Sequence, residues 1–264
     1  MNLKISAIIC GRNEATKLIN CLESLEFCDE IIYGDLNSSD NSVEIASKYN
    51  AKIYEFIKFG PAGEYTQSEL IKKVKNDWVL LMDPDEVVDP ILAKDIQKTL
   101  NEIQFDNEIG DIYVPWQFYF GGIKLRGTVW GFNKFKGIVV NKNRYEILPI
   151  THYGKRLKQG FKSYYLENNK DNLLHHFWMD DWNKFIDKHK RYLIDEGQDR
   201  YDLGERISFF SLIFNVPFQF YICFIRRKGY LDGWIGFRLS LFWVWYNSSS
   251  NLSLFLIQLG KRNE

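Results

Sequence analysis

Short strand-like segments alternate with helix-like segments through the first hundred residues, and this alternation constrains the fold more than any other feature. Strands are predicted at residues 3–10, 30–34, 52–57 and 78–82. Helices are predicted at residues 14–25, 39–49, 63–75 and 89–103. The last of these helices begins with Asp89 as its N-cap and Pro90 at its first position. Repeated alternation of this kind favours an α/β domain with a mostly parallel sheet flanked by helices.

Polar residues follow three of these strands at the point where each strand ends. The three clusters are Arg12-Asn13-Glu14, residues 35–40 and Asp83-Pro84-Asp85-Glu86. Ligands of open α/β sheets bind outside the carboxyl ends of the strands, so we expect the three clusters to share one edge. Grouped carboxylates repel one another, and a divalent cation relieves that repulsion. Oxygen ligands such as those of the Asp83-x-Asp85 motif select Mg²⁺ or Mn²⁺.

The two halves of the chain differ in charge and in aromatic content. Residues 1–100 hold 11 Lys/Arg and 17 Asp/Glu, a balance of −6, whereas residues 101–264 hold 23 and 17, a balance of +6. Of the 43 Phe, Trp and Tyr residues, 35 lie after residue 100. Two different environments are therefore expected along one chain.

The last part of the chain combines aromatic side chains with a basic flank. Residues 207–246 contain 14 aromatics, and Arg226-Arg227-Lys228 directly follows the apolar run 207–225. The favoured interpretation is a pair of helices that lie in the interface of an anionic membrane. An apolar core subdomain and a transmembrane helix stay open as alternatives.

Several motifs in the first hundred residues occur in the order typical of one enzyme family. They are IICGRNE at 8–14, CLESL at 21–25, DEII at 29–32, residues 35–40 leading into 43–46, DWVL at 77–80 and DPDE at 83–86. These motifs resemble inverting glycosyltransferases of family 2, which have the nucleotide-sugar-binding fold called GT-A. Within that family, the chain is most similar to the branch that builds lipopolysaccharide cores and cell-surface glycans. The resemblance is dense over residues 3–104 and thinner beyond, for example at Gly121-Gly122, His175-His176 and residues 229–234.

The resemblance implies roles for individual positions. Asp35 would accept hydrogen bonds from the nucleotide base, and Asn13 and Glu14 would lie near the base and ribose. Asp85 would ligate the Mn²⁺ or Mg²⁺ ion at the donor's diphosphate, with Asp83 nearer the ribose and Glu86 supporting the loop. The implied nucleotide-sugar site is Arg12, Asn13, Glu14, Asp35, Ser38, Asp40 and Gln67, and the implied metal ligands are Asp85, His152 and His176.

An inverting transfer also needs a group that takes the proton of the acceptor hydroxyl. Glu86, Asp180 and Asp181 are candidates, and the sequence does not choose among them; the predicted catalytic set is Asp83, Asp85, Glu86 and Asp181. His189 lies within a basic segment, so we expect it at the surface.

Two positions depart from the pattern of the family. Gln67-Ser68 stands where members of this branch often have Arg-Asn, which removes a cation that could touch the diphosphate. Asn37 replaces a glycine, although asparagine tolerates the left-handed conformation better than most residues.

The expected function is an inverting, metal-dependent transferase that moves a sugar from a nucleotide-diphosphate donor, with a UDP-sugar favoured, to a lipopolysaccharide, lipid-linked or other cell-surface glycan. We expect it in the cytoplasm at the inner face of the membrane, in peripheral contact with lipid and with an oligomer possible. The predicted parts are a donor half at 1–110, an acceptor-side half at 111–200 and an aromatic helical region at 201–264.

The alternative function is a catalytically degenerate nucleotide- or glycan-binding relative that acts as an assembly partner. A dinucleotide oxidoreductase and a P-loop kinase are disfavoured because the chain has neither a G-x-G-x-x-G turn after the first strand nor a G-x-x-x-x-G-K-[ST] loop. Nucleic-acid binding is disfavoured as well, because the basic residues do not form a dense stripe.

Overall fold

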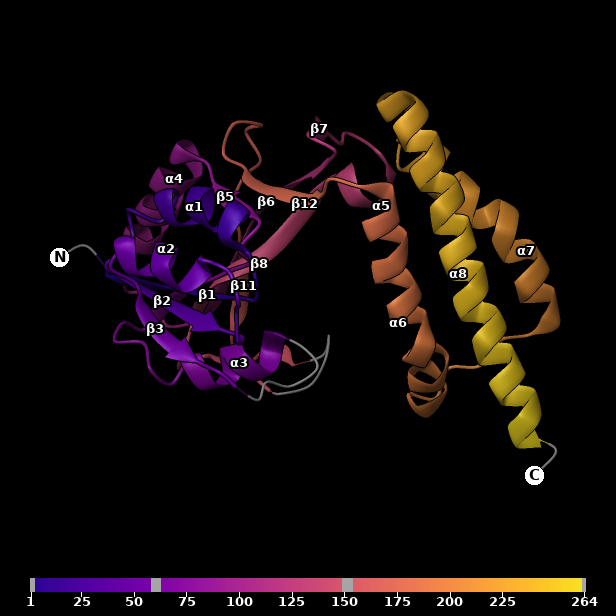
Figure 1. Ribbon diagram of the computed structural model, residues 1–264, viewed down its shortest axis with the longest axis horizontal. Coiled ribbons are helices and arrows are strands. Elements are labelled where there is room, and N and C mark those ends of the chain that lie inside the picture. Colours follow the sequence, from indigo (N-terminus) through magenta and orange to yellow (C-terminus); the bar gives the residue numbers. More distant parts are fainter. Residues whose placement is uncertain (1–2, 58–62, 149–153, 263–264) are drawn as a thin grey trace. The chain divides into compact units, whose positions relative to one another are not determined.

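The computed structural model describes residues 3–57, 63–148 and 154–262, which form two compact units (Figure 1). The first unit comprises Met1–Gln117 and Phe135–His176, and the second comprises Phe118–Lys134 and Phe177–Glu264. The chain therefore passes between the units more than once. The predicted functional division at residues 110 and 200 stays a prediction.

Four parallel strands form the part of the sheet that the N-terminal sequence builds. Strand β1 (Ile5–Gly11) pairs with β2 (Glu30–Asp35) on one side and with β4 (Trp78–Met82) on the other, and β3 (Lys52–Glu55) pairs with β2. Every residue of β4 is buried, as expected of a strand whose two faces are both covered.

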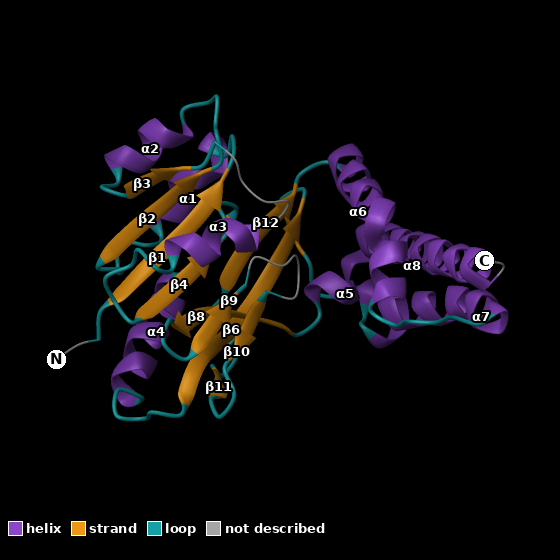
Figure 2. Ribbon diagram, turned by 90° about the horizontal axis from the view of Figure 1, so that it is seen from below, coloured by secondary structure: helices purple, strands orange, loops and turns teal. Residues whose placement is uncertain are grey.

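Helices flank both faces of this sheet (Figure 2). They are α1 (Ala15–Glu23), α2 (Ser42–Lys48), α3 (Gly63–Leu70) and α4 (Pro90–Glu102). Alternate residues of β1 reach opposite faces: Ile9 lies in the core that contains Leu18 and Leu22 of α1, whereas Ile8 lies in the core that contains Leu70 of α3. Asp89 caps α4 as predicted, since its carboxylate accepts a hydrogen bond of 2.8 Å from the Ile91 amide.

The second half of the chain extends the sheet with antiparallel pairs. Strand β8 (Lys134–Asn141) pairs with β4, and β5 (Glu86–Val88) pairs with β12 (Leu174–Met179), which places His176 opposite Glu86. The strand order is β3-β2-β1-β4-β8-β6-β12-β5, with β6 at Ile109–Phe120. Four shorter strands are β7 (Ile123–Lys124), β9 (Tyr145–Ile147), β10 (Lys155–Leu157) and β11 (Lys162–Tyr165). The predicted α/β class is confirmed.

Aromatic rings form the core of the second unit. Its helical elements are α5 (Thr128–Gly131), α6 (Trp182–Asp202), α7 (Phe209–Phe220), the π-helical turn η1 (Tyr221–Arg226), the 3₁₀ turn η2 (Gly229–Asp232) and α8 (Gly233–Arg262). The Trp130 ring stacks on Trp178 with centroids 5.4 Å apart. The ring centroids of Phe185 in α6 and Phe242 in α8 are 4.2 Å apart. The predicted aromatic-rich helical region at the C-terminus is confirmed.

Polar side chains also tie α6 to α8. The Glu196 carboxylate accepts hydrogen bonds from the Tyr246 hydroxyl and, at 2.9 Å, from the Ser250 hydroxyl. Arg200 donates to the Ser250 hydroxyl at 2.8 Å and to Asn251 at 3.0 Å. Gly197 permits this close packing, because a Cβ atom there would lie 2.2 Å from the Ser253 hydroxyl oxygen.

The expectation that His189 lies at the surface is wrong. Its ring is buried against Phe185, Phe242 and Tyr246, and its Nδ1 lies 2.8 Å from the Phe185 carbonyl oxygen. The basic neighbours of His189 in the sequence misled the interpretation, because residues four apart on a helix share a face and Phe185 and His189 both point toward α8. Burial lowers the pKa of His189 below its ordinary value of 6.5, although the Phe185 carbonyl opposes the shift.

Because the folded state disfavours a proton on His189, the free energy of unfolding should be highest above pH 6.5 and should fall as the pH drops toward the lowered pKa. The variant His189→Leu should lose this part of the pH dependence. Urea unfolding of both proteins at several pH values between 5 and 8 measures the difference. An unchanged slope in the variant would assign the pH dependence to other groups.

Candidate functional site

Hydrogen bonds tie the loop after β1 to the loop after β2. The Asn13 amide donates to the Ser38 hydroxyl at 3.0 Å, and the Asn13 side-chain oxygen accepts from the Ser39 amide at 2.7 Å. Asn13 and Asn37 both have positive φ angles, 57° and 61°, a conformation that asparagine adopts more readily than most residues. Asn37 thus adopts the left-handed conformation for which the sequence resemblance implied a glycine.

Asp40 holds the first turns of α1 and α2. Its carboxylate accepts from the Ala15 amide at 3.1 Å, from the Ser42 amide at 3.0 Å and from the Ser42 hydroxyl at 2.5 Å. These hydrogen bonds, led by the one from Ser42, lower the pKa of Asp40. The structure therefore shows Asp40 organising the site, and its predicted contact with the nucleotide stays a prediction.

Arg12 and Glu14 belong to the same edge. The Glu14 amide donates to the Ser42 hydroxyl at 3.0 Å, which adds a further link between α1 and α2. The side chain of Arg12, two residues before Glu14, is exposed. The loop after β4 also reaches this region, because a Cβ atom on Gly11 would lie 2.8 Å from Pro84. The three predicted clusters therefore meet at one edge of the sheet.

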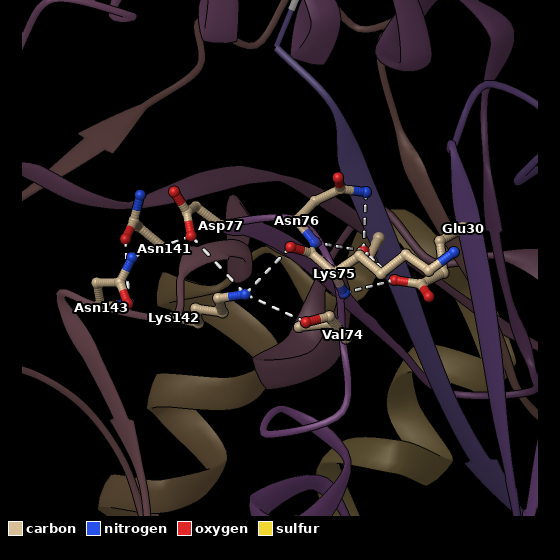
Figure 3. A network of polar contacts seen from close by, with 9 residues as sticks. Glu30, Val74, Lys75, Asn76, Asp77, Asn141, Lys142 and Asn143 are labelled. Atoms are coloured by element: carbon tan, nitrogen blue, oxygen red, sulfur yellow. Dashed lines mark hydrogen bonds and ion pairs between the residues drawn. The ribbon is translucent and has the colours of Figure 1, made fainter.

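A buried carboxylate stands at each end of β2, and the two have different surroundings. At the start of the strand, Glu30 accepts from the Ser6 hydroxyl at 2.7 Å and from the Lys52 ammonium at 2.7 Å. It also accepts from the Lys75 amide at 2.8 Å, within the network of Figure 3. Burial opposes ionisation of Glu30, but these donors lower its pKa. Both oxygens of Glu30 are satisfied from within the chain, so this edge of the sheet is structural.

Asp35, at the other end of β2, is only partly satisfied. Its Oδ2 accepts from the Ser38 amide at 3.1 Å, whereas its buried Oδ1 has no hydrogen-bond partner among the residues that the structure describes. The side-chain oxygen of Gln67, a buried residue of α3, also has no hydrogen-bond partner among the described residues. Buried acceptors without a donor are costly, so these two atoms point to a ligand that supplies N–H or O–H groups.

Lys136 of β8 binds two carboxylates of the acidic loop. Its ammonium lies 2.7 Å from Asp83 Oδ2 and 2.7 and 2.8 Å from the two oxygens of Glu86. Glu86 also accepts from the Asp83 amide at 3.0 Å and is fully buried. Burial opposes ionisation of Asp83, but Lys136 overrides it and holds the pKa of Asp83 well below its usual range. The charge of Lys155 acts on Asp83 in the same direction.

The sequence interpretation missed Lys136. A lysine inside a strand whose later residues are all buried was the available signal, because lysine is almost never enclosed without a carboxylate partner. The enclosure of Glu86 favours its predicted role as a support of the loop over that of a general base, since both of its oxygens are engaged.

Asp85 is the carboxylate of this loop that Lys136 does not bind, and its side chain is 21% exposed. His176 of β12 places Nε2 3.3 Å from Asp85 Oδ1, and the Lys17 ammonium lies 3.9 Å from Asp85 Oδ2. The His176 ring stacks on Trp116 with centroids 5.1 Å apart and an interplanar angle of 10°. Trp116 also lies under the Lys136 ammonium, 5.0 Å from the ring centroid, so one aromatic side chain positions both groups.

The predicted metal ligands are thus brought together in part. Asp85 and His176 are in contact, whereas His152 lies outside the described residues. Over residues 3–57, 63–148 and 154–262, no group of three or more His, Cys, Asp or Glu side chains is arranged to hold a metal ion. The Asp85 carboxylate suits a hard cation such as Mg²⁺ or Mn²⁺, which takes its other ligands largely from substrate phosphates and water.

Asp181 lies in the second unit. Its carboxylate caps α6 by accepting from the Asn183 amide at 2.8 Å and the Lys184 amide at 3.0 Å. Its side chain is exposed. The predicted role of Asp181 as a proton acceptor stays a prediction.

Comparison with known proteins gives one family and several distant relatives. The profile of the family described as Glycosyl transferase family 2 matches residues 6–152, which is more than half of the chain. An uncharacterized glycosyltransferase of Rickettsia bellii is 35% identical over 115 residues, which make up 43% of this chain and only 37% of that protein. The lipopolysaccharide core biosynthesis glycosyltransferase LpsC of Rhizobium meliloti is 25% identical over 241 residues, 89% of this chain and 86% of that protein.

Solved structures show a weaker likeness. Glucosyl-3-phosphoglycerate synthase from Mycobacterium tuberculosis, in complex with Mn²⁺, uridine diphosphate and glucosyl-3-phosphoglycerate, is 14% identical with a TM-score of 0.39. The match covers 53% of this chain and 57% of that one.

The variant Lys136→Met should lower the free energy of unfolding by about 3–5 kcal/mol, because it leaves the enclosed Glu86 carboxylate without its cation. Adding Glu86→Gln should restore part of the loss, since the second change removes the uncompensated charge. Urea unfolding of the two single variants and the double variant measures the coupling.

Lys142→Met is the matched control. Lys142 follows the same strand and its side chain is 23% exposed, against 19% for Lys136, but it donates mainly to the carbonyl oxygens of Val74 and Lys75. Its removal should cost about 1 kcal/mol. Additive effects of Lys136→Met and Glu86→Gln would contradict the interpretation of Lys136 as the partner of Glu86.

Proposed function

The chain belongs to glycosyl transferase family 2, and from that membership we propose that it transfers a sugar from a nucleotide-diphosphate donor to a glycan acceptor, with inversion at the anomeric carbon. The observation that carries the proposal is the edge of the sheet at which Asp35, Asp85 and His176 lie. There, the partly unsatisfied Asp35 ends β2, Asp85 follows β4, and His176 of β12 contacts Asp85. These are the groups that a nucleotide diphosphate requires.

The nucleotide base is proposed to bind at the end of β2. Asp35 Oδ1 is a buried acceptor that lacks a donor among the described residues, and a base can supply a ring N–H to it. Uracil presents one such N–H between two carbonyl groups, so a UDP-sugar is the proposed donor. Gln67, with its own unsatisfied buried oxygen, is the proposed second contact to the nucleotide.

Asp85 and His176 are the residues that would hold a divalent cation, Mn²⁺ or Mg²⁺, at the diphosphate. When bound, such an ion neutralises the negative charge that grows on the departing diphosphate. Lys136 leaves Asp85 free for this task because it engages Asp83 and Glu86. Lys17 adds positive charge beside Asp85, and Lys155 acts on Asp83, so the site has cations although Gln67-Ser68 replaces Arg-Asn.

The proton of the acceptor hydroxyl needs an exposed carboxylate as its acceptor. Glu86 is enclosed, and the depressed pKa of Asp83 makes it a weak base. Asp181 and its neighbour Asp180 therefore stay as the proposed bases. Asp181 holds its carboxylate at the surface of the second unit while it caps α6.

The proposed acceptor is a lipopolysaccharide core or another cell-surface or lipid-linked glycan. Support comes from the Rhizobium meliloti relative, whose alignment extends over 89% of this chain. Such acceptors are assembled on lipids, so we place the protein in the cytoplasm at the inner face of the membrane.

A catalytically degenerate binding protein is the second candidate. The replacement of Arg-Asn by Gln67-Ser68 favours it, because one expected cation is absent from α3. It predicts that uridine diphosphate binds without any turnover of a donor.

The variant Asp85→Ala should reduce sugar transfer or donor hydrolysis on the order of 100-fold or more, because it removes a carboxylate from the cation at the leaving group. It should also remove the dependence of uridine diphosphate binding on Mn²⁺, measured by calorimetry with and without the metal. Asp35→Ala should weaken uridine diphosphate binding whether or not Mn²⁺ is present.

Asp77→Ala is the control, because Asp77 is a 64% exposed carboxylate in the structural network of Figure 3. It should leave both measurements unchanged. Metal-independent binding and a complete lack of turnover by the wild-type protein across a panel of nucleotide sugars would favour the degenerate binder.

A further inference from the structure

Helix α7 has its apolar side chains on the outside. None of its twelve residues, Phe209–Phe220, all of which the structure describes, is buried. Phe210 and Phe214 are 71% and 68% exposed, and Pro217 and Tyr221 continue the exposed face at helical spacing. Within the described residues, Phe209–Arg226 is the one helical segment long and apolar enough to cross a membrane, and 6% of it is buried.

Two polar side chains of α7, Asn215 and Gln219, form hydrogen bonds on the side of the helix that packs on α8. Gln219 donates to Asn215 at 3.0 Å on the same helix and accepts from the indole N–H of Trp243 in α8 at 2.8 Å. A helix at the surface of a water-soluble protein has the opposite arrangement, with apolar residues inward and polar residues outward. The medium that suits the outer face of α7 is therefore apolar.

The charges next to this face have one sign. Arg226 and Lys228 are exposed where η1 ends, and the sequence contains no Asp or Glu between Glu205 and Asp232. Tyr230 and Trp234, which are 49% and 70% exposed, follow directly. Tyrosine and tryptophan favour the boundary between lipid tails and head groups, and clustered cations bind anionic head groups.

We propose that α7 and η1 form a docking surface for an anionic phospholipid bilayer. Phe210 and Phe214 insert among the acyl chains, and Arg226 and Lys228 contact the phosphate groups of the lipids. The proposal concerns the second unit and does not depend on the transferase activity, because lipid binding requires neither donor nor metal.

The packing of α8 decides that this surface lies in the plane of the membrane and does not cross it. Helix α8 packs on α7 and also holds Glu196 and Arg200 of α6 through Ser250 and Asn251. These charged groups of α6 would lie inside the hydrocarbon if α7 and its neighbours spanned the bilayer, and burial there is expensive. One face of α7 in the lipid leaves them in water.

Co-sedimentation of the full chain with preformed vesicles tests the proposal. The protein should bind vesicles of phosphatidylcholine with about one third phosphatidylglycerol much more tightly than vesicles of phosphatidylcholine alone. Phe210→Gln/Phe214→Gln should weaken binding to the vesicles by at least about tenfold, because the variant lacks the two aromatic rings that insert into the lipid. Arg226→Gln/Lys228→Asn should weaken it by about fivefold per cation, and added salt should reproduce that loss.

Phe105→Gln is the matched control, since Phe105 is 86% exposed in the first unit. It should leave vesicle binding unchanged, and circular dichroism should show the same helix content in all variants. Equal binding of the wild-type protein and the Phe210/Phe214 variant would overturn the proposal. So would a wild-type dimer that this variant turns into a monomer with vesicle binding unaffected, because the face would then be an interface between two copies of the chain.

Discussion

The contact of Lys136 with Asp83 and Glu86 is the interaction on which the edge of the first unit depends. Three carboxylates stand within four residues of one loop, and the loop keeps its place because one buried ammonium neutralises two of them. Glu86 adds a hydrogen bond to the Asp83 amide and pairs through β5 with His176 on β12. The same contact therefore leaves Asp85 as the carboxylate that Lys136 does not bind, and His176 lies beside it.

The two edges of the sheet show how stability and binding are separated in this fold. The carboxylate at the start of β2, Glu30, receives hydrogen bonds on both oxygens, whereas the carboxylate at its end, Asp35, keeps one buried oxygen without a partner among the described residues. A fully satisfied buried group stabilises the fold, and a partly satisfied one costs free energy until a ligand completes it. That difference supports the proposed site at the carboxyl ends of the strands.

Much of the first unit could be predicted from sequence because its signals are local. Short apolar runs predicted the strands β1, β2 and β4, Asp89-Pro90 predicted the start of α4, and the strand-end clusters predicted the edge. Lys136 and His189 could not be placed in this way. The partner of Lys136 lies 50 residues away in the chain, and the basic neighbours of His189 conceal the helical face that it shares with Phe185. The exposure of the apolar side chains of α7 could not be predicted either, because the sequence does not show which apolar residues of a helix face a neighbouring helix.

The sequence by itself determined the α/β class, the family, and the residues from which a nucleotide-sugar site is proposed, because these follow from periodicity and from motifs in consecutive residues. Only the tertiary structure decided how the carboxylates divide their tasks. Asp83 and the buried Glu86 bind Lys136, Asp85 contacts His176, and Asp40 accepts hydrogen bonds from the first residues of two helices. The physical reason is that the charge state and availability of a carboxylate depend on burial and on partners from distant strands, and neither is a local property of the chain.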